Sequence, residues 1–334
     1  MISTNQVLEH YQGAVPRYTS YPTAPQFKSG EGPDLLQEMF SCLDGREPVS
    51  VYVHIPFCDR LCWFCGCNTK HTNRYQPIEN YLGYVVEELA LLRKQMPGKQ
   101  PISHLHLGGG SPSLLTMPDM FALRAALETV FDFDANTEVS VEIDPSDSNQ
   151  EMLDGLKAIG ITRASIGVQD FHPDVQKAIN RPQTFADTAR VVDQLRSIGV
   201  SSINMDALYG LPLQSEKRLL NTLKKCASLQ PDRMALFGYA HVPWMKKHQQ
   251  MIKQEDLASP AERFEHASKG SEYLKSAGYD AIGIDHFAKP TDSMAISAKN
   301  GTLHRNFQGY TTDNAKTMIG VGASSIGYFE NGYI

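Results

Sequence analysis

The sequence lacks several features that mark other classes of protein. It has no long apolar run, so no membrane-spanning helix is predicted, and its N-terminal string MISTNQVLEHYQGAV has no apolar segment typical of a secretion signal. It has no basic excess, since 31 Lys and Arg residues stand against 37 Asp and Glu residues, and the net charge of −6 argues against a general nucleic-acid binder. These absences predict a cytoplasmic protein with reduced thiols that does not span a membrane and does not bind nucleic acid.

Cysteine is also scarce, and it is unevenly distributed. Four of the six cysteines lie within ten residues, in the string HIPFCDRLCWFCGCNTK. Cys58, Cys62 and Cys65 have the spacing C-x3-C-x2-C, which supplies three thiolates to one metal centre and no fourth. Because a cubane iron–sulfur cluster normally has four thiolate ligands, three would leave one iron with an open coordination position. Open positions are typical of catalytic metal sites, so the spacing favours an enzyme.

A structural zinc site is the main alternative interpretation of this string. Cys62 and Cys65 form a C-x2-C pair of the zinc-knuckle type, but such sites usually have a second, distant pair. The remaining candidates, Cys42 and Cys226, stand alone. Aromatic residues between the cysteines would form the apolar shell that limits solvent around a cluster: Phe57, Trp63 and Phe64. The spacing and its surroundings favour a cluster over zinc.

Short β-rich runs alternate with helical patterns from residue 50 onward. The expected strands are 50–55, 102–107, 138–143, 163–168, 202–208, 233–239, 279–284 and 316–322. Strands that alternate with helices predict a parallel sheet, and this number of units favours an α/β fold built as a partial or full (β/α) barrel. Residues 1–48 are predicted to form an N-terminal extension that reaches the active site, with a proline-rich loop at 13–27 and a short helix near 35–43. Residues 49–334 are predicted to form the barrel domain.

A barrel of this kind carries its chemistry at the C-terminal ends of its strands. Glycine or polar residues follow the expected strands at this end: Gly108–Ser111, Glu142, Asp144, Gln169, Asp170, Asn204, Asp206, Tyr239, His241, Asp285 and His286. The three glycines allow positive φ and a close approach of a ligand to the backbone, and a tight strand–helix turn is the alternative. His54, His104 and His106 alternate along strands, and we interpret them as ordinary core residues.

Two groups of motifs connect the chain to known families. The cysteine triplet, together with GGGSP at 108–112 and VEIDP at 141–145, resembles the radical S-adenosylmethionine (SAM) enzymes. Longer strings resemble, more narrowly, the oxygen-independent coproporphyrinogen III oxidases (coproporphyrinogen dehydrogenases), and they span nearly the whole chain: PRYTSYPTA (16–24), YVHIPFC (52–58), CGCN (65–68), IGVQDF (166–171), LYGLP (208–212), YAHVP (239–243), DHFA (285–288) and HRNFQGYTT (304–312).

The resemblance implies roles for individual residues. Cys58, Cys62 and Cys65 match the cluster ligands, whereas Cys67 matches a further cysteine that does not ligate the cluster. In the family, the amino and carboxylate groups of SAM chelate the fourth iron, which accounts for the missing thiolate. The residues that match contacts to this SAM are Tyr52, Gly109, Glu142 and Ile326. Those that match contacts to a second SAM are Phe64, Gly110, Ser111, Gln169, Arg181, Asp206 and Ala240.

The resemblance also implies the reaction. An electron from a reduced 4Fe-4S cluster cleaves SAM, and the resulting 5′-deoxyadenosyl radical removes a hydrogen from the β-carbon of a substrate propionate. Loss of carbon dioxide and one electron then leaves a vinyl group. Two propionates of coproporphyrinogen III react in this way, without oxygen, and give protoporphyrinogen IX in haem biosynthesis. The expected cofactors are one cluster and two molecules of SAM, the expected partners are the porphyrinogen and a reductant, and the protein is expected to be a monomer.

Two arginines are predicted to bind the substrate, and one domain of the family is expected to be missing. Arg17 and Arg305 lie in family-specific strings and are the candidates for binding the four substrate carboxylates, because arginine suits bidentate carboxylate recognition. The family has a further, mainly helical C-terminal domain, which we expect to be missing from a chain that ends at Ile334.

Two alternative functions remain open. A haem chaperone or haem-trafficking protein of the same superfamily is the first, but such proteins generally lack the counterpart of Cys67 and the RYTSYPT segment, and both are present here. A non-catalytic zinc-binding or cluster-scaffold protein is the second.

Overall fold

Strands and helices alternate along the chain, so that most strands of the main sheet are followed by a helix that covers them. The computed structural model describes residues 10, 26–28, 32–306 and 309–334. The helices are α2 (Gly32–Ser41), α3 (Gln76–Gln95), α4 (Met117–Val130), α5 (Gln150–Ile159), α6 (Pro173–Ala178), α7 (Phe185–Ser197), α8 (Glu216–Ser228), α9 (Pro260–Ser276) and α10 (Ser293–Asn300). The strands of the main parallel sheet are β1 (Val49–Ile55), β4 (Gln100–Gly109), β6 (Glu138–Ile143), β7 (Arg163–Gln169), β8 (Ser202–Tyr209), β9 (Arg233–Gly238) and β14 (Met318–Val321).

Shorter elements complete the fold. The short strands are β2 (Phe57–Cys58), β3 (Lys70–His71), β5 (Phe131–Asp132), β10 (Asp280–Ala281), β11 (His286–Ala288), β12 (His304–Asn306), β13 (Gly309–Thr311), β15 (Tyr328–Phe329) and β16 (Gly332–Tyr333). Single 3-10 turns are η2 (Pro112–Leu114), η3 (Pro145–Asp147), η4 (Lys247–Met251) and η5 (Gln254–Asp256). No helix in the described part of the chain is both long and apolar enough to cross a membrane.

The parallel strands follow the order β9-β8-β7-β6-β4-β1-β14. The first parallel strand in the chain, β1, pairs with β4 on one side and with the last, β14, on the other. Short antiparallel strands extend the sheet at both edges, with β11 and β10 beside β9 and with β15 and β16 beside β14. Among the described strands β9 and β14 are not paired, so the predicted barrel is a partial one.

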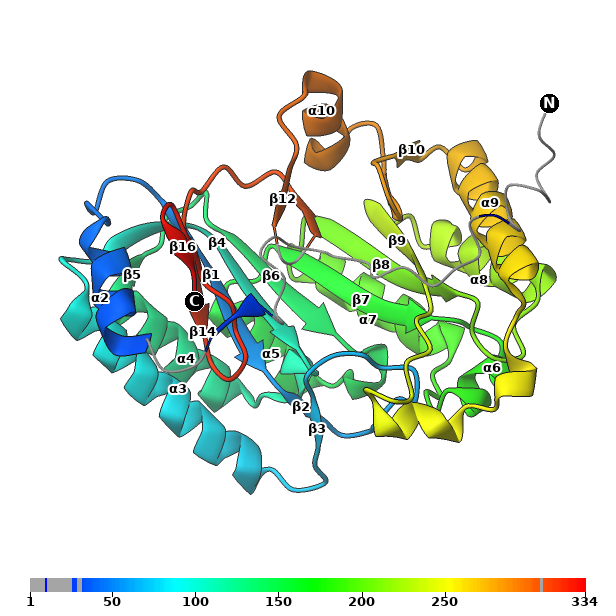
Figure 1. Cartoon of the computed structure of the whole chain (residues 1–334), viewed down its shortest axis with the longest axis horizontal. Coiled ribbons are helices and arrows are strands. Elements are labelled where there is room, and N and C mark those ends of the chain that lie inside the picture. The colour runs from blue at the N-terminus through cyan, green and yellow to red at the C-terminus, as the bar shows by residue number, and fades with distance from the viewer. Residues whose placement is uncertain (1–9, 11–25, 29–31, 307–308) are drawn as a thin grey trace.

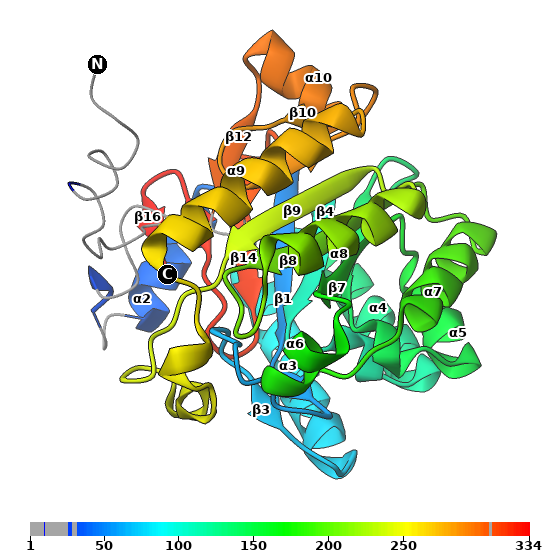
Figure 2. The ribbon, with the colours of Figure 1, turned by 90° about the vertical axis from the view of Figure 1, so that its right-hand side faces the viewer.

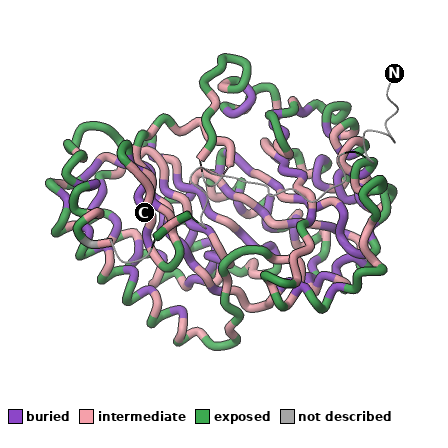
Figure 3. The backbone as a smooth tube through the Cα atoms, viewed as in Figure 1, coloured by how far each residue is buried: buried purple, intermediate pink, exposed green. Residues whose placement is uncertain are grey.

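The two faces of the sheet differ in chemistry because successive side chains of a strand point to opposite faces. In β1, the buried Val51 and Val53 alternate with Tyr52 and His54. The apolar set of each strand packs into one large core with the helices, and Figures 1 and 2 show α3, α4, α5, α7 and α8 together on one side of the sheet. We call the opposite face, which carries the polar set, the inner face. Figure 3 shows the strands as mainly buried or half-buried, with exposed residues concentrated in the outer helices and loops.

The prediction of a strand at 279–284 is wrong. Only Asp280 and Ala281 form a strand there, and this strand runs antiparallel to β11, which in turn runs antiparallel to β9. The physical reason is a pair of turns, since Gly283 (φ 82) and Asp285 (φ 67) both adopt the left-handed conformation that ends a strand. Asp285 and His286 therefore do not stand at the C-terminal end of a parallel strand.

The helix predicted near 35–43 is α2, and it belongs to the main core. Its Met39 and Phe40 are buried, and the Phe40 ring packs edge-on against Phe329 of β15 with a centroid separation of 5.6 Å. The proline-rich loop predicted at 13–27 lies, except for its last two residues, outside the described residues.

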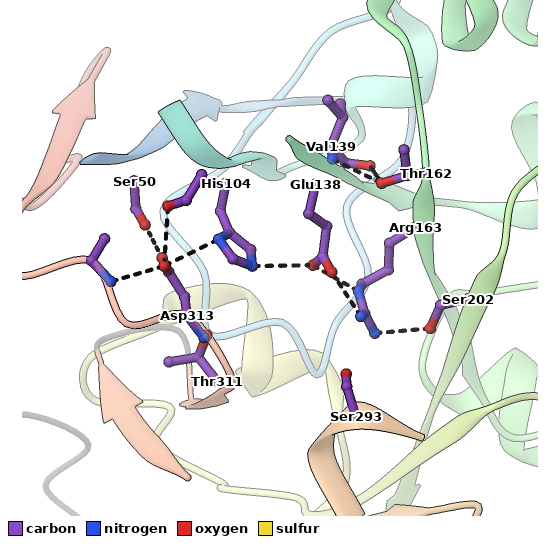
Figure 4. Close-up of polar contacts among 12 residues, drawn as sticks. Ser50, His104, Glu138, Val139, Thr162, Arg163, Ser202, Ser293, Thr311 and Asp313 are labelled. Atoms are coloured by element: carbon purple, nitrogen blue, oxygen red, sulfur yellow. Dashed lines mark hydrogen bonds and ion pairs between the residues drawn. The ribbon is translucent and has the colours of Figure 1, made fainter. Parts of the chain in front are cut away.

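A polar network crosses the sheet at the N-terminal ends of its strands (Figure 4). We call these residues the N-terminal network: Ser50 of β1, His104 of β4, Glu138 of β6, Arg163 of β7, Ser202 of β8, and Asp313 of the segment before β14. Glu138 accepts two hydrogen bonds of 2.8 Å from Arg163, and Arg163 donates a third of 2.8 Å to Ser202. His104 forms an ion pair of 3.1 Å with Asp313, which also accepts from Ser50. The network ties the segment before β14 to five strands of the sheet.

Candidate active site

The cysteine-containing loop leaves the C-terminal end of β1, as the sequence predicted. Side chains and backbone from elsewhere fix it in place: the Nδ2 atom of Asn180 donates to the Leu61 oxygen at 2.9 Å, and the backbone N–H of Trp63 donates to the Ile179 oxygen at 2.9 Å. Cys58 lies in β2, which pairs with β3 and so closes the loop at its base. The three predicted ligands are therefore carried by a loop with fixed ends.

A second segment, residues 241–253, packs on the same loop, although the two segments are about 180 positions apart in the sequence. The Nε2 atom of Gln249 donates to the oxygen of Phe64 at 3.0 Å, and His248 contacts the oxygen of Cys65 at 2.7 Å. The Lys246 ammonium donates to the oxygen of Cys67 at 2.9 Å. These contacts satisfy successive carbonyl groups that an irregular loop would otherwise leave without partners.

The four cysteines of the loop differ in their surroundings. All are free thiols. Burial raises the pKa of Cys58 to about 12, and burial also raises the pKa of Cys62. A hydrogen bond from Cys67 lowers the pKa of Cys65 to about 6, and the same bond raises the pKa of Cys67. The prediction that Cys67 does not ligate the cluster stays a prediction.

Arg181 connects the loop to the sheet. Its guanidinium donates to the Sγ atom of Cys62 at 3.5 Å and to the oxygen of Gly167 at 2.6 Å, and it pairs with the Asp144 carboxylate at 2.9 Å. Burial lowers the pKa of Arg181, but Asp144, Cys62 and Asp147 together outweigh burial and the pKa lies above its ordinary value. Arg181 is only 8% exposed, and its Nε atom has no hydrogen-bond partner in the described residues. A buried donor without a partner is costly, so this atom points to a bound acceptor.

The Gly108–Ser111 turn uses its own N–H groups within the protein. The Gly109 N–H donates to the Glu142 carboxylate at 3.0 Å, and the Gly110 N–H donates to the Ile55 oxygen at 2.8 Å. The Ser111 N–H donates to the Phe57 oxygen at 2.7 Å. The N–H groups of Gly109, Gly110 and Ser111 are therefore already bonded within the protein, so this part of the turn suits an amino group better than a carboxylate.

The glycines of this turn are required by close packing. A Cβ atom on Gly109 would lie 2.3 Å from the His54 ring, and one on Gly110 would lie 2.4 Å from the Phe57 oxygen. Gly109 also has φ 109, which other residues rarely adopt. The glycine run is therefore a tight turn, and its role in binding a ligand stays a prediction.

Glu142 lies in a group of aromatic and acidic side chains on the inner face. Its Oε1 atom is 3.4 Å from the Nε2 atom of His106, and His106 stacks on Tyr52 with centroids 5.7 Å apart. Although burial raises its pKa, His106 outweighs burial and the pKa of Glu142 lies below its ordinary value. The Tyr52 hydroxyl bonds to the Nδ1 atom of His54 at 2.9 Å. A carboxylate held ionised here can accept hydrogen bonds from hydroxyl or ammonium groups.

A cavity of about 320 Å³ opens beside this group. Four residues predicted to contact the second SAM line it: Phe64, Gln169, Asp206 and Ala240. Gln169 reaches the cavity from a bulge in β7, where its φ is 65 and the register with β8 shifts. Burial raises the pKa of Asp206 to about 6, and Asp206 accepts hydrogen bonds from Asn204 at 2.8 Å and Ser165 at 3.1 Å.

The other predicted residues do not line this cavity. Gly110 and Ser111 are in the glycine turn, and Arg181 is bonded to Cys62. Ile326 lies in the loop after β14, and a Cβ atom on Gly320, which is opposite Tyr52 in the sheet, would be 2.9 Å from its backbone. Their roles as SAM contacts stay predictions.

Several residues of the site were missed from the sequence. His54 and His106 contact Tyr52 on the inner face, and His54 is buried with both ring nitrogens bonded, as expected of a core residue. The cavity is also lined by Gly66, Leu208, Phe237, Gly238, Tyr239, Val242 and Gln249. The histidines could have been found from their alternation with buried valine and leucine, which marks a polar face. Gln249 carries no local signal, because its contacts depend on the fold.

These residues fit an iron–sulfur cluster. The donors are thiols alone, they come from one loop, and a buried cation with a spare donor stands beside one of them. No three His, Cys, Asp or Glu side chains of the described residues come together closely enough to hold a single metal ion. In a cluster each thiolate binds a different iron, so its thiols need not meet at one point as they must around zinc.

The fold and the site define a class of enzyme. A family model described as the radical SAM superfamily matches residues 52–226. The solved structure of coproporphyrinogen III oxidase from Escherichia coli, described as a radical SAM enzyme, superposes with a TM-score of 0.92 at 38% identity, and the match covers 99% of this chain and 75% of that chain. The chain has a radical SAM fold, and its cofactors are a 4Fe-4S cluster and SAM.

Curated relatives narrow the class. An oxygen-independent coproporphyrinogen III oxidase of Cereibacter sphaeroides is 46% identical over 333 residues, which are 100% of this chain and 74% of that protein. The enzyme of the same name from Escherichia coli K12 is 40% identical over 320 residues, which are 96% of this chain and 70% of that protein. The chain belongs to the family of oxygen-independent coproporphyrinogen III oxidases.

Proposed function

We infer that the protein converts two propionate side chains of coproporphyrinogen III to vinyl groups in haem biosynthesis, without oxygen, and so forms protoporphyrinogen IX. Each propionate loses one hydrogen atom from its β-carbon, one molecule of carbon dioxide and one electron. The observation that carries this inference is a three-thiol loop beside a cavity of about 320 Å³, in a chain that matches such oxidases over its whole length.

The cysteine loop would hold the cluster through Cys58, Cys62 and Cys65. When bound, the cluster supplies one electron for the cleavage of SAM and an open iron position for the amino and carboxylate groups of SAM. Arg181 fixes Cys62 and places a positive charge beside its sulfur. The segment 241–253 holds the carbonyl groups of the loop and limits the access of water.

We propose that four residues contact the SAM at the cluster: Tyr52, Gly109, Glu142 and Ile326. The carbonyl oxygens of the glycine turn are suited to its amino group, because the N–H groups of that turn are already used. Glu142, with its lowered pKa, remains an acceptor near neutral pH and can bind ribose hydroxyls.

We propose that the cavity takes a second SAM, through Phe64, Gln169, Asp206 and Ala240. Its volume is within the range of small-molecule sites. Asp206 has a pKa of about 6, so at neutral pH most of it is ionised and it can offset a sulfonium charge. We propose that Gly110, Ser111 and Arg181 also contact this SAM, and we assign the unpartnered Nε atom of Arg181 to a ligand carboxylate or hydroxyl.

Arg305 and Arg17 remain the proposed substrate contacts. Arg305 is exposed in β12, and its guanidinium lies 5.3 Å from the centre of the Tyr310 ring. Arg17 lies outside the described residues. The pair Arg17→Gln and Arg305→Gln should raise the KM for porphyrinogen about tenfold or more and leave SAM cleavage intact, whereas Arg93→Gln with Arg190→Gln on the outer helices should change neither. If the first pair weakened porphyrinogen binding and SAM cleavage equally, or changed neither, the assignment would be refuted.

We also propose that residues 1–48 form an extension to a barrel domain of residues 49–334, and that the protein is a cytoplasmic monomer. Burial of Met39 and Phe40 in the main core supports an extension that docks on the barrel. Size-exclusion chromatography with light scattering checks the monomer, and a dimeric mass would contradict it.

The function is tested by anaerobic reconstitution and turnover. The protein is loaded with iron and sulfide and incubated with SAM, dithionite and coproporphyrinogen III. We expect 5′-deoxyadenosine, carbon dioxide and the divinyl product. Formation of 5′-deoxyadenosine without vinyl product would favour a haem-binding role, and zinc without sulfide in the anaerobically purified protein would refute the cluster.

A further inference from the structure

Two neighbouring strands of the sheet, β1 and β14, each lead into a segment of the site. β1 leads into the cysteine loop, and β14 leads into residues 322–327, which we call the β14 loop and which contain Ile326. The parallel pairing of the two strands ends at Val53 and Val321. Because the ladder stops there, other contacts have to set the distance between the cysteine loop and the β14 loop.

Tyr81 of α3 joins the two strand ends. Its hydroxyl donates to the oxygen of His54 at 2.6 Å and accepts from the backbone N–H of Ala323 at 3.0 Å. His54 directly follows the last paired residue of β1, and Ala323 lies two positions beyond the last paired residue of β14. Burial raises the pKa of Tyr81 above its ordinary value, so the hydroxyl stays protonated and can donate.

Glu88, seven residues further along α3, holds the same loop. Its Oε2 atom accepts from the backbone N–H of Gly322 at 2.9 Å. Residues seven positions apart lie on the same side of a helix, two turns from each other. The side chains of Tyr81 and Glu88 therefore bind two successive N–H groups of the β14 loop, Gly322 and Ala323, and fix its first turn to α3.

Gly322 shows how closely the hydroxyl fits. A Cβ atom at this position would overlap the Tyr81 hydroxyl and would lie 2.9 Å from the His54 oxygen. Gly322 also has φ 89, which other residues rarely adopt. The turn thus brings bare backbone against the tyrosine, which is a second observation that the loop is built around this contact.

We propose that the Tyr81 hydroxyl is a positioning group for the SAM bound at the cluster. Tyr81 packs against the main core and does not line the cavity, so it acts through the β14 loop. The proposal rests on the proposed function, in which one SAM binds both at the cluster and at Ile326. A ligand that contacts two segments binds tightly only when these segments are already at the required distance.

A different role for Tyr81 would be to support the cysteine loop. Its ring packs edge-on against Phe57, which precedes Cys58, with a centroid separation of 5.5 Å. The substitution Tyr81→Phe keeps the ring and removes only the hydroxyl. This variant therefore separates a role in the β14 loop from a role in cluster binding.

The test compares Tyr81→Phe with Tyr279→Phe in the cluster-loaded protein. Tyr279 is a matched control, since it is buried and its hydroxyl donates to the oxygen of Pro231 at 2.9 Å, just before β9. SAM is titrated against the reduced cluster, and the electron paramagnetic resonance spectrum follows binding at the cluster and not in the cavity. Amide hydrogen exchange without SAM measures the opening of residues 322–326, and urea unfolding measures stability.

We expect Tyr81→Phe to weaken SAM binding at the cluster about tenfold, because the loop must then be ordered by the ligand. Exchange in residues 322–326 should become faster, whereas the iron content and kcat at saturating SAM should stay unchanged. Tyr279→Phe should lower stability by a similar amount and leave SAM binding and this exchange unchanged.

Glu88 provides a second pair of variants. Glu88→Ala removes the acceptor for the Gly322 N–H and should weaken SAM binding about threefold. Glu88→Gln keeps an oxygen acceptor at this position and should restore binding to within about twofold of the unmodified protein. Equal loss of SAM binding in the two Glu88 variants would contradict the role of this hydrogen bond.

Unchanged SAM binding in Tyr81→Phe would overturn the proposal, and so would an equal loss of SAM binding in Tyr81→Phe and Tyr279→Phe. A loss of iron from Tyr81→Phe would also overturn it and would assign Tyr81 to the cysteine loop. If Tyr81→Phe weakened SAM binding as expected but the unmodified protein formed no vinyl product, the proposed function would fail and the role of Tyr81 would stand.

Discussion

The two ends of the sheet use the same kind of residue for opposite purposes. At the N-terminal end, Glu138 and Arg163 bind each other and their neighbours, and the network shown in Figure 4 closes on itself. At the C-terminal end, Arg181 retains an unpartnered Nε atom and Asp206 faces a cavity. Where polar side chains of the inner face form hydrogen bonds to one another, they stabilise the sheet. Where some of these groups have no partner in the protein, they can bind a ligand. Substitutions at the N-terminal end should therefore reduce the free energy of unfolding, and substitutions at the C-terminal end should reduce activity.

The largest expected effect is at the C-terminal end. Cys62→Ser should abolish cluster binding, and product formation should fall by about three orders of magnitude or more, because the cofactor supplies the reactive chemistry. The matched control is Cys226→Ala, a buried cysteine of α8 that should reduce stability and leave the iron content unchanged. Iron and sulfide analysis with urea unfolding separates the two, and equal iron content in both variants would contradict the assignment of Cys62.

The next effect is at the N-terminal end. Arg163→Met leaves the Glu138 carboxylate without its main partner, and we expect the free energy of unfolding to fall by about 2–3 kcal/mol, less than for a fully buried pair because Glu138 is 28% exposed. The double change Arg163→Met with Glu138→Leu should recover much of this loss. Urea unfolding measures it. If the Arg163→Met protein lost iron while its stability stayed unchanged, the N-terminal end would also serve the chemistry, and the proposed difference between the two ends would be wrong.

Arg181 should affect both stability and the chemistry of the cluster, and its replacement should have a moderate effect on each. Arg181→Gln removes a positive charge from beside the Cys62 sulfur, which makes the cluster harder to reduce. We expect the reduction potential to fall by about 60 mV, the one-electron equivalent of a tenfold change. A redox titration followed by electron paramagnetic resonance measures it, and Arg181→Lys, which keeps the charge, should shift the potential less. Equal shifts in both variants would refute an electrostatic cause.

The smallest effect concerns pH. Burial lowers the pKa of His104, but its hydrogen bond with Asp313 and the charges of Asp313 and Glu138 together outweigh burial, so the pKa is raised. This stabilisation is complete below about pH 6.5 and is lost as the pH rises through the raised pKa. Burial raises the pKa of Asp313, but His104 outweighs it and the pKa is lowered, so its contribution is lost only in acid, below about pH 4. His104→Gln should therefore cost about 1 kcal/mol more in the free energy of unfolding at pH 5.5 than at pH 8.5.

A second histidine provides the control for this pH dependence. Burial lowers the pKa of His266, so its replacement should show the opposite trend, with a larger loss of stability at high pH than at low pH. Urea unfolding at both pH values measures the two variants. The same trend for both would refute the role of the network in the pH dependence.

Much of the fold and of the cysteine site could be predicted from the sequence because the signals are local. The spacing of Cys58, Cys62 and Cys65, the glycine turn and the β-rich runs each lie within a few residues. The radical SAM fold and the family membership that they indicated are confirmed. The roles of the individual SAM contacts stay predictions.

What could not be predicted depends on contacts between distant residues. Nothing near Lys246 shows that it will bond to the oxygen of Cys67, 179 positions away. The N-terminal network likewise joins Ser50 to Asp313, which are 263 positions apart. The surroundings of His54 and His106 could not be predicted for a different reason, since a strand with apolar alternation does not reveal whether its second face is core or cavity. The 279–284 run failed because its β-rich composition concealed two turns.

The glycine turn has a thermodynamic consequence. Its N–H groups are bonded before any ligand arrives, and the close approach of His54 and Phe57 leaves its backbone little freedom. Binding at this turn should therefore cost little conformational entropy, and the affinity of the site should depend on contacts already in position and not on a loop that must first be ordered.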